Sequence, residues 1–153
     1  MGDIDMKSII ITASIHHGNT RKVVDAIADV YGVEVVDATK VTEFDLSDYD
    51  LIGFASGVYG GNFHQKVMDF GAKNLPNGKN VFFIMTSAMN RDFSRSMMKA
   101  IADKDANVLG TFHCVGYNTF GPFKLFGGTG KGHPDATDLE KAVAFYKGIT
   151  EKI

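Results

Sequence analysis

The chain has 153 residues, of which 44% are hydrophobic and 22% are charged. This balance is typical of a folded globular domain and argues against intrinsic disorder and against collagen-like or coiled-coil architectures. Its formal net charge of −2 gives no electrostatic reason to bind nucleic acid or anionic lipid, and its length predicts a single domain over residues 1–153.

Five short apolar runs rich in β-branched residues predict strands that are buried on both faces, as in a parallel sheet covered by helices. The runs are Ser8–Ala13, Val33–Asp37, Leu51–Ser56, Val81–Thr86 and Val108–Val115. Between the first two runs, apolar residues at helical spacing predict a helix that ends at Gly32. Its expected inward face consists of Val23, Val24, Ile27, Val30 and Tyr31.

Three further helices are predicted later in the chain. One begins near His64 and buries Val67, Met68 and Phe70, and the next buries a face made of Phe93, Met97, Met98, Ile101 and Ala102. The start of the last helix is placed by Thr137-Asp138-Leu139-Glu140, which matches the S/T-x-x-E capping box. Residues 38–50, by contrast, are polar and acidic and predict a short or irregular connection.

This alternation of strands and helices predicts an α/β fold, a doubly wound five-stranded parallel sheet with helices on both faces. Ligands of such sheets bind beyond the carboxyl ends of the strands. The candidate loops are therefore those after the first, third and fourth strands, at 14–21, 57–63 and 87–92, together with the long segment 116–134 after the fifth.

The loop after the first strand has the features of an anion site. Ser14-Ile15-His16-His17-Gly18-Asn19-Thr20 leads from an apolar strand directly into an amphipathic helix. Backbone N–H groups at a helix N-terminus, together with hydroxyl and imidazole donors, suit a phosphate monoester. The alternative is that Asn19 or Thr20 only caps the helix and Gly18 only turns the chain. We expect no metal here, because adjacent histidine side chains diverge and the one thiol of the chain, Cys114, is distant in sequence.

The loops after the third and fourth strands suit a flat heterocycle. Ser56-Gly57-Val58-Tyr59-Gly60-Gly61-Asn62-Phe63 combines glycines, whose peptides can reorient, with aromatic side chains, of which Tyr59 is the first candidate to stack on a redox-active isoalloxazine ring. The alternative is a glycine-rich turn whose Tyr59 and Phe63 fold back onto the core. Ser87, Ala88, Met89 and Asn90 are small or polar enough for the edge of a ring to approach, although they also fit a plain turn.

These loops resemble those of the flavodoxin family. The resemblance rests on the phosphate loop that ends in Gly18-Asn19-Thr20, on Ser56-Gly57-Val58-Tyr59-Gly60, and on the tail Gly116–Leu125 with Lys131–Pro134, and it extends from about Lys7 to Ile149. It implies noncovalently bound FMN, the strand order 2-1-3-4-5, and one-electron transfer through a flavin semiquinone. Family contacts to the phosphate correspond to Ser14, His16, His17, Gly18, Asn19 and Thr20. Contacts to the ring correspond to Ser56, Gly57, Val58, Tyr59, Gly60, Ser87, Ala88, Met89 and Asn90.

The function that the resemblance implies is that of a small electron-transfer carrier. Its partners would be redox proteins, it would be a monomer or a weak dimer, and it would need no catalytic residue. The alternative is an NAD(P)H-dependent FMN reductase acting on quinones or similar acceptors, with residues 117–126 walling off or building a second pocket over the ring. The chain departs from many flavodoxins, which are strongly acidic and stack tryptophan on the flavin, because its charge is only −2 and it contains no Trp.

Other doubly wound proteins fit the sequence poorly. A phosphoryl-accepting receiver would need acidic residues where Ala13-Ser14 and Ser56-Gly57 stand, and a low-molecular-weight tyrosine phosphatase would need arginine in place of Phe120 after Cys114. With one cysteine, an acidic start at MGDIDMKS and no apolar run near the roughly 20 residues that span a bilayer, we expect a cytoplasmic protein without a membrane partner.

Overall fold

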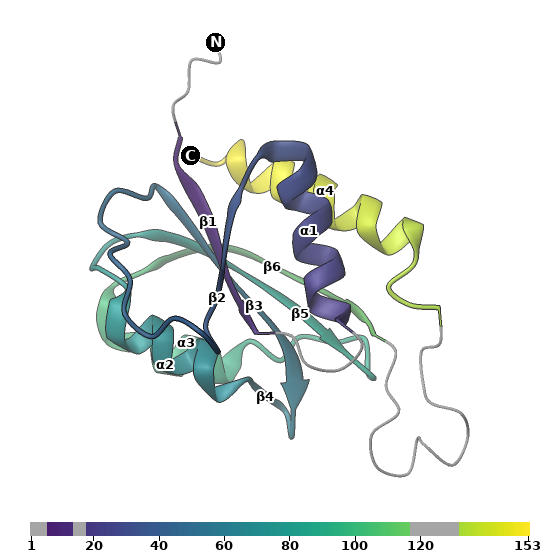
Figure 1. Cartoon of the computed structure of the whole chain (residues 1–153), viewed down its shortest axis with the longest axis horizontal. Coiled ribbons are helices and arrows are strands. Elements are labelled where there is room, and N and C mark those ends of the chain that lie inside the picture. The colour runs from purple at the N-terminus through teal and green to yellow at the C-terminus, as the bar shows by residue number, and fades with distance from the viewer. Residues whose placement is uncertain (1–5, 14–17, 117–131) are drawn as a thin grey trace.

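The structure, a computed structural model, describes residues 6–13, 18–116 and 132–153. Along the described chain the elements are β1 (Ser8–Ala13), α1 (Asn19–Tyr31), β2 (Glu34–Asp37), β3 (Leu51–Tyr59), β4 (Asn62–Phe63), α2 (Gln65–Asn74), β5 (Asn80–Ser87), α3 (Arg95–Ala100), a short 3₁₀ helix (Ala102–Lys104), β6 (Asn107–Val115) and α4 (Ala136–Thr150). Five strands are parallel in the order β2-β1-β3-β5-β6 (Figure 1). Counted without β4, this is the expected order 2-1-3-4-5, so the fold prediction is confirmed.

The strand count needs one correction, because the sheet has a sixth strand, β4. Gly60 and Gly61 adopt φ angles of +60° and +84°, which reverse the chain directly after Tyr59. Two consecutive residues with positive φ are the geometry of the tight turns that join antiparallel strands. The third predicted strand therefore runs on past Ser56 and pairs with β4 at Val58–Phe63 and Tyr59–Asn62.

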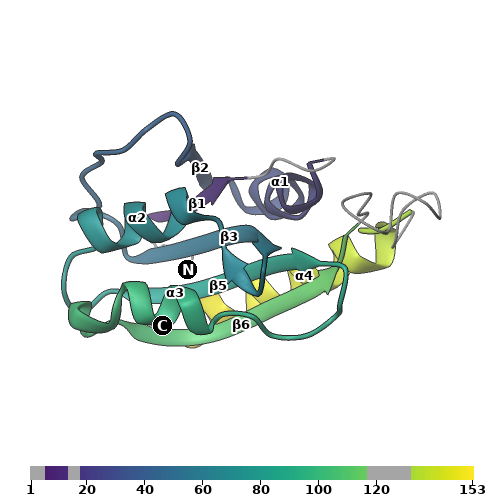
Figure 2. The ribbon, with the colours of Figure 1, turned by 90° about the horizontal axis from the view of Figure 1, so that it is seen from below.

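Successive side chains along each buried strand point to opposite faces of the sheet, so the core consists of two layers. Ile9 and Ile11 of β1 face one cluster, which also receives Val67 and Phe70 of α2 and Met97 of α3. Ile10 faces the opposite cluster, which contains Val23, Val24 and Ile27 of α1 and Ala142, Tyr146 and Ile149 of α4. Helices thus cover both faces of the sheet, as Figure 2 shows from below.

Two helices bury less than the sequence predicts. Val30 and Tyr31, in the last turn of α1, are 61% and 41% exposed, although Gly32 ends the helix as expected with φ +65°. In α3, Met97 is fully buried, whereas Met98 is 41% exposed and Ala102 lies outside the helix and is exposed. Because α3 spans only six residues, it has one narrow inward face, and Met98 lies beside it.

The start of α4 lies two residues before the predicted one. Asp135 is the N-cap and accepts the Asp138 N–H at 2.9 Å, while the Asp138 carboxylate accepts the Asp135 N–H at 2.9 Å. These two hydrogen bonds form a capping box, which the sequence had predicted for Thr137 and Glu140. The predicted irregular connection over 38–50 is confirmed. None of the helices in the described ranges is long and apolar enough to cross a membrane.

Candidate functional site

The described part of the phosphate loop begins α1 without a capping side chain. The N-cap is Gly18, which adopts a left-handed φ of +62°. The alternative that Asn19 or Thr20 caps this helix is therefore wrong, since both belong to its first turn and are buried. Gly18 has no side-chain oxygen to accept the first N–H groups of the helix, and such groups suit an anion. Ser14, His16 and His17 lie outside the described residues.

A hydrogen bond between two threonines joins the start of α1 to the end of β5. Thr20 Oγ1 and Thr86 Oγ1 lie 2.8 Å apart in a buried position, 66 residues apart in sequence. Thr86 in turn pairs in register with Gly57 of β3. Two hydroxyls that share one hydrogen bond retain one hydroxyl hydrogen for another acceptor. The pair therefore places a donor between the predicted phosphate loop and the predicted ring loops.

Gly116 at the end of β6 lies against Asn19. A Cβ atom at Gly116 would stand 2.7 Å from Asn19 Nδ2 and 3.0 Å from its Cγ, closer than real side chains pack. The Gly116 N–H donates to the Ser87 carbonyl at 2.9 Å, which fixes this approach. Glycine is thus required for the Asn19 amide to keep its position, a role that sequence reasoning missed because the two residues are far apart in the chain.

The loop after β3 is organised by the buried hydroxyl of Ser56. Ser56 Oγ accepts the His64 N–H at 2.8 Å and donates to the Gly57 carbonyl at 2.5 Å. His64 also begins α2, because its Nδ1 accepts the Lys66 N–H at 3.0 Å. Ser56 therefore joins the end of β3 to the N-terminus of α2 and holds the Gly57 peptide in one orientation.

The two aromatic residues of this loop have different positions. Phe63 is buried and packs edge-on against Phe83, with ring centroids 6.2 Å apart, so for Phe63 the alternative of packing in the core holds. Tyr59 is half-buried and packs edge-on against the His64 ring at 5.5 Å. Its hydroxyl lies 3.2 Å from the place of a Cβ at Gly57. Tyr59 thus lies along the loop at the carboxyl edge and does not fold into the core as Phe63 does, and its contact with a ring stays a prediction.

Substituting Ser56 tests whether this hydroxyl organises the loop. Ser56→Ala leaves the His64 N–H without its acceptor, and we expect the free energy of unfolding to fall by about 1–2 kcal/mol. Urea denaturation followed by circular dichroism measures the change. Ser47→Ala is the matched control, since the Ser47 hydroxyl is exposed and bonds only the Asp45 carboxylate two residues away. Equal stability of the two variants would contradict the role assigned to Ser56.

The loop after β5 is a tight turn at the same edge. The Ser87 hydroxyl and the Arg91 N–H both donate to the Met89 carbonyl, the latter at 2.8 Å. Asn90 Oδ1 lies 2.8 Å from Nδ1 of His113 on β6. Ser87, Ala88, Met89 and Asn90 therefore border the carboxyl ends of β5 and β6, with Met89 54% exposed. His64 and His113 are site neighbours that no sequence motif indicated.

Cys114 has no features of a nucleophile. The side chain is buried in β6, and this burial, followed by the nearby Asp138 and Asp135 carboxylates, raises the pKa of the thiol to about 12. A thiol with so high a pKa stays protonated near neutral pH, whereas catalytic cysteines need the thiolate. The expectation that Cys114 is a buried strand residue is confirmed.

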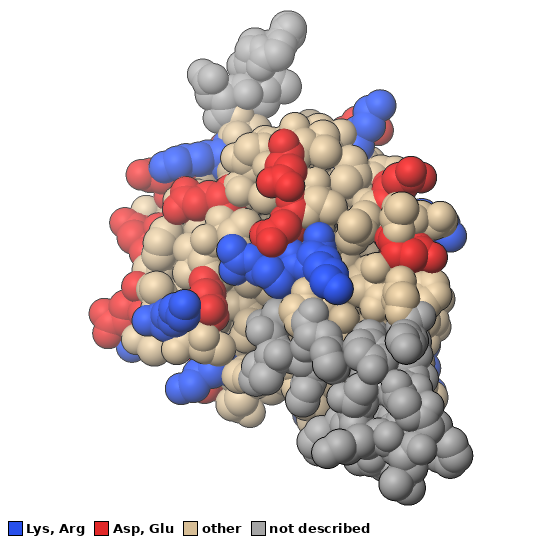
Figure 3. Space-filling view, turned by 45° about the vertical axis from the view of Figure 1, so that its right-hand side comes forward, with Lys and Arg blue, Asp and Glu red and all other residues tan. Residues whose placement is uncertain are grey.

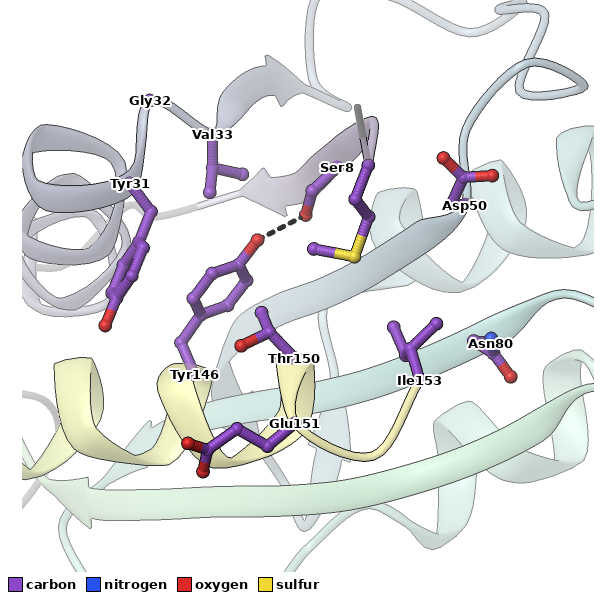
Figure 4. A pocket seen from close by; sticks show the side chains of 11 residues that line it. Ser8, Tyr31, Gly32, Val33, Asp50, Asn80, Tyr146, Thr150, Glu151 and Ile153 are labelled. Atoms are coloured by element: carbon purple, nitrogen blue, oxygen red, sulfur yellow. Dashed lines mark hydrogen bonds between the residues drawn. The ribbon is translucent and has the colours of Figure 1, made fainter. Parts of the chain in front are cut away.

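A cavity of about 990 Å³ lies at the opposite edge of the sheet (Figure 4). Its lining includes Ser8, Asp50 and Asn80, which lie at or next to the starts of β1, β3 and β5. Two of its polar side chains bond one another, since the Tyr146 hydroxyl donates to Ser8 Oγ at 2.8 Å. Because ligands of doubly wound sheets bind at the carboxyl edge, we assign no role in cofactor binding to this cavity.

At the N-terminus of α4, His133 forms a pH-dependent contact with the capping pair. His133 Nδ1 lies 2.7 Å from Asp138 Oδ2, and this hydrogen bond raises the pKa of His133 above 6.5. Partial burial of Asp138 opposes ionisation, but the hydrogen bonds from His133 and Asp135 hold its pKa below 3.8. The contact is therefore strongest when His133 is protonated and Asp138 ionised.

This contact predicts a specific pH profile. A group whose pKa is raised in the folded state stabilises the fold below its unfolded pKa and loses that effect as the pH rises through the folded pKa. We expect wild type to exceed His133→Gln in melting temperature most clearly at about pH 5.5, with a smaller difference at about pH 8.5. Thermal denaturation across this range measures it. A difference that stays constant or grows with pH would contradict the assignment.

Charge on the face shown in Figure 3 is mixed in sign, with blue and red side chains interspersed rather than one acidic field. Among the described residues, charges of opposite sign also pair directly, as Arg21 and Asp25 do at 2.9 Å.

Comparison with known proteins agrees with the geometry of the carboxyl edge. A family model described as Flavodoxin domain matches residues 9–120, a range that contains the three loops after β1, β3 and β5. The chain belongs to the flavodoxin family. The predicted resemblance is thus confirmed.

Individual relatives extend the family match to almost the whole chain. The uncharacterized protein MJ0298 of Methanocaldococcus jannaschii is 38% identical over 147 residues, which cover 94% of this flavodoxin-family chain and 98% of that protein. Two solved structures share the fold. A flavodoxin from the domain Archaea has a TM-score of 0.66 at 17% identity and covers 96% of this chain and 98% of its own. A Lactobacillus acidophilus flavoprotein in complex with FMN has a TM-score of 0.54 at 17% identity and covers 71% and 93%.

Proposed function

We propose that the protein binds FMN noncovalently at the carboxyl edge of its sheet and works as a small one-electron carrier. The observation that carries the proposal is the convergence of two kinds of loop at one place. The Thr20–Thr86 hydrogen bond joins the N-terminus of α1, where the N-cap is Gly18, to the end of β5, and Thr86 pairs with Gly57 of the glycine-rich loop after β3. A phosphate and the ring of one ligand could therefore be held on either side of this bond.

The residues present fit FMN. Gly18 has no side chain that could cap the N–H groups in the first turn of α1, and N–H groups at such a position suit a phosphate. Asn19 and Thr20 belong to the same turn. At the end of β1, the buried Thr12 Oγ1 has no hydrogen-bond partner within the described ranges. Ser56 to Gly60 and Ser87 to Asn90 would border the ring. Membership of the flavodoxin family and the FMN complex of the Lactobacillus flavoprotein support the same cofactor.

The chemistry of electron transfer belongs to the flavin, which accepts and returns single electrons when it is bound. The protein contributes position and hydrogen bonds. In the flavodoxin family a backbone carbonyl of the loop after the third strand turns toward the reduced ring, and Gly57 and Gly60 are the two candidates here. Ser56 Oγ already donates to the Gly57 carbonyl. Gly60 is the other candidate; it is exposed in the turn between β3 and β4, and a Cβ there would have no atom within 4 Å. We therefore propose Gly60 as the residue whose carbonyl turns toward the ring.

Stepwise anaerobic reduction of the FMN-loaded protein tests the carrier role. A carrier should show the absorption of a one-electron-reduced flavin at intermediate potentials and no steady oxidation of NAD(P)H with a quinone acceptor. Direct passage to the two-electron-reduced flavin with steady NAD(P)H turnover would contradict the carrier and favour the alternative, an FMN reductase.

A further inference from the structure

We propose that the exposed face of α3 and the turn before it form a docking surface for a redox-partner protein with an acidic surface. The proposal rests on the proposed function, because it assumes that a bound flavin exchanges electrons with a protein. We call this surface the α3 patch and define it as Met89, Arg91, Arg95, Met98 and Lys99.

The α3 patch borders the loops that would hold the ring. Met89 belongs to the turn after β5, and Arg91 follows it two residues later. The helix is also tied directly to the hairpin after β3, since the Phe63 N–H of β4 donates to Ser96 Oγ at 3.0 Å. A protein seated on the patch would therefore lie next to the predicted edge of the flavin, as short-range electron transfer requires.

The patch combines positive charge with exposed methionine. Arg95, Met98 and Lys99 are spaced three and four residues apart, so they share one side of the helix, and all are exposed. Residues 89–101 contain three basic residues and one acidic one, a net charge of +2 in a chain whose net charge is −2. Met98 is 41% exposed, and a flexible thioether adapts to a partner surface.

The cations of the patch have no acidic partner among the described residues. Elsewhere, basic side chains form ion pairs, as in Arg21–Asp25 and Lys73–Glu43. Asp92 is the acid nearest in sequence, and its carboxylate already accepts the Ser94 N–H at 2.7 Å. Arg91 instead lies over the Phe93 ring, 4.7 Å from its centroid, which holds its charge at the surface.

The distribution of acids supports an acidic partner and not a basic one. Glu43, Asp45, Asp48 and Asp50 lie within residues 43–50, a segment that contains no Lys or Arg. This segment connects β2 to β3, and its end lies at the start of β3, away from the carboxyl edge. Complementary charge steers protein association. An acidic protein would accordingly approach α3, where one electron would leave the reduced partner and enter the oxidised flavin of this protein.

Binding can be measured without electron transfer. We would titrate the full-length, FMN-loaded, ¹⁵N-labelled protein with an oxidised plant-type ferredoxin as the acidic probe and with cytochrome c as the basic probe. We expect ferredoxin to shift the amide resonances of residues 91–99 at about 20 mM salt and to lose this effect at about 500 mM. Tighter binding of cytochrome c to the same amides, or ferredoxin shifts confined to other elements, would overturn the proposal.

Charge reversal supplies the matched comparison. Arg95→Glu with Lys99→Glu should weaken ferredoxin binding about tenfold or more, whereas Lys141→Glu with Lys147→Glu on α4 makes the same change in net charge and should weaken it less than about threefold. If amide dispersion shows that the first variant misfolds, Arg95→Gln with Lys99→Gln replaces it. Equal loss in both double variants would show a net-charge effect and overturn the docking surface.

Three further outcomes separate the proposals. Shifts at α3 with inorganic tripolyphosphate but none with ferredoxin would mean a site for a small anion, and the protein docking surface would be wrong. A chain that fails to bind FMN overturns the proposed function and with it the redox role of the partner, while ferredoxin shifts at α3 in the same FMN-free sample would support only the binding of an acidic protein to this surface. A chain that binds FMN and ignores ferredoxin overturns the surface alone.

Discussion

Gly53→Ala is expected to lower the free energy of unfolding by about 2–3 kcal/mol. Gly53 lies in β3, in the middle of the parallel sheet, and a Cβ there would stand 2.4 Å from Cζ of Phe82 on the neighbouring strand. The Phe82 ring is fully buried and packs against Phe145 and Tyr146 of α4, with centroids 6.1 and 5.8 Å away. It therefore has no room to move aside, and urea denaturation should show the loss directly.

A second glycine provides the control for Gly53. Gly148 lies in α4, and a Cβ there would have no atom within 4 Å. Gly148→Ala should stabilise the protein by about 0.4–1 kcal/mol, since alanine favours the helix and restricts the unfolded chain. The double variant Gly53→Ala with Phe82→Leu should recover part of the lost stability, because the smaller side chain makes room. A Gly53→Ala protein as stable as wild type would contradict the close packing of β3 against β5.

Gly116→Ala is expected to weaken FMN binding about tenfold or more while changing the stability of the FMN-free protein much less. The new Cβ would stand 2.7 Å from Asn19 Nδ2, so the Asn19 side chain must leave its position in the first turn of α1. A hydrogen bond to a charged group contributes about 1.5–3 kcal/mol, which corresponds to that loss if Asn19 binds the phosphate. Fluorescence titration with FMN gives the affinity, and urea denaturation gives the stability.

Riboflavin, which lacks the phosphate, distinguishes a local effect from a general one. If Gly116→Ala acts through Asn19 and the phosphate, its affinity for riboflavin should change less than about twofold. Gly78→Ala, in a turn remote from the candidate loops, should leave FMN affinity unaltered, although its φ of +78° makes it a strained substitution. Unchanged FMN affinity in Gly116→Ala would remove Asn19 from the phosphate site.

The central strands were predictable from sequence because burial on both faces leaves an unmistakable apolar run. The bounds of β1 match the prediction residue for residue. What the pattern could not predict is the course of the chain after Ser56. Val58 and Tyr59 look like loop residues among glycines, yet they continue β3 because Gly60 and Gly61 turn the chain back onto it. A hairpin that follows a buried strand has no apolar run of its own to indicate it.

Helix ends were harder to predict because several residues can perform the same capping role. At α4, Asp135 and Asp138 form the capping box two residues before the motif that sequence alone favoured. At α1, the sequence left open that Asn19 or Thr20 caps the helix, whereas the N-cap in the structure is Gly18. Only the distances between backbone donors and side-chain oxygens decide such cases.

For the candidate site, the position of the loops was predictable from sequence, but the contacts between them were not. The loops themselves follow from the strand order, since parallel strands bring their carboxyl ends to one edge. The contacts that organise them do not, because Thr20 meets Thr86, Asn19 meets Gly116, and Asn90 meets His113 only after the sheet has formed. Each pair is separated by 23 or more positions, and neither partner belongs to a motif that indicates the other.

The proposed function depends most directly on the binding of FMN itself. The decisive measurement is a titration of free FMN with the cofactor-free protein, followed by flavin fluorescence, with circular dichroism as the check that the protein is folded. We expect saturable quenching with one FMN bound per chain and a weaker affinity for riboflavin than for FMN. Unquenched fluorescence in a folded sample would contradict the proposed function and remove the flavin from the carboxyl edge of the sheet.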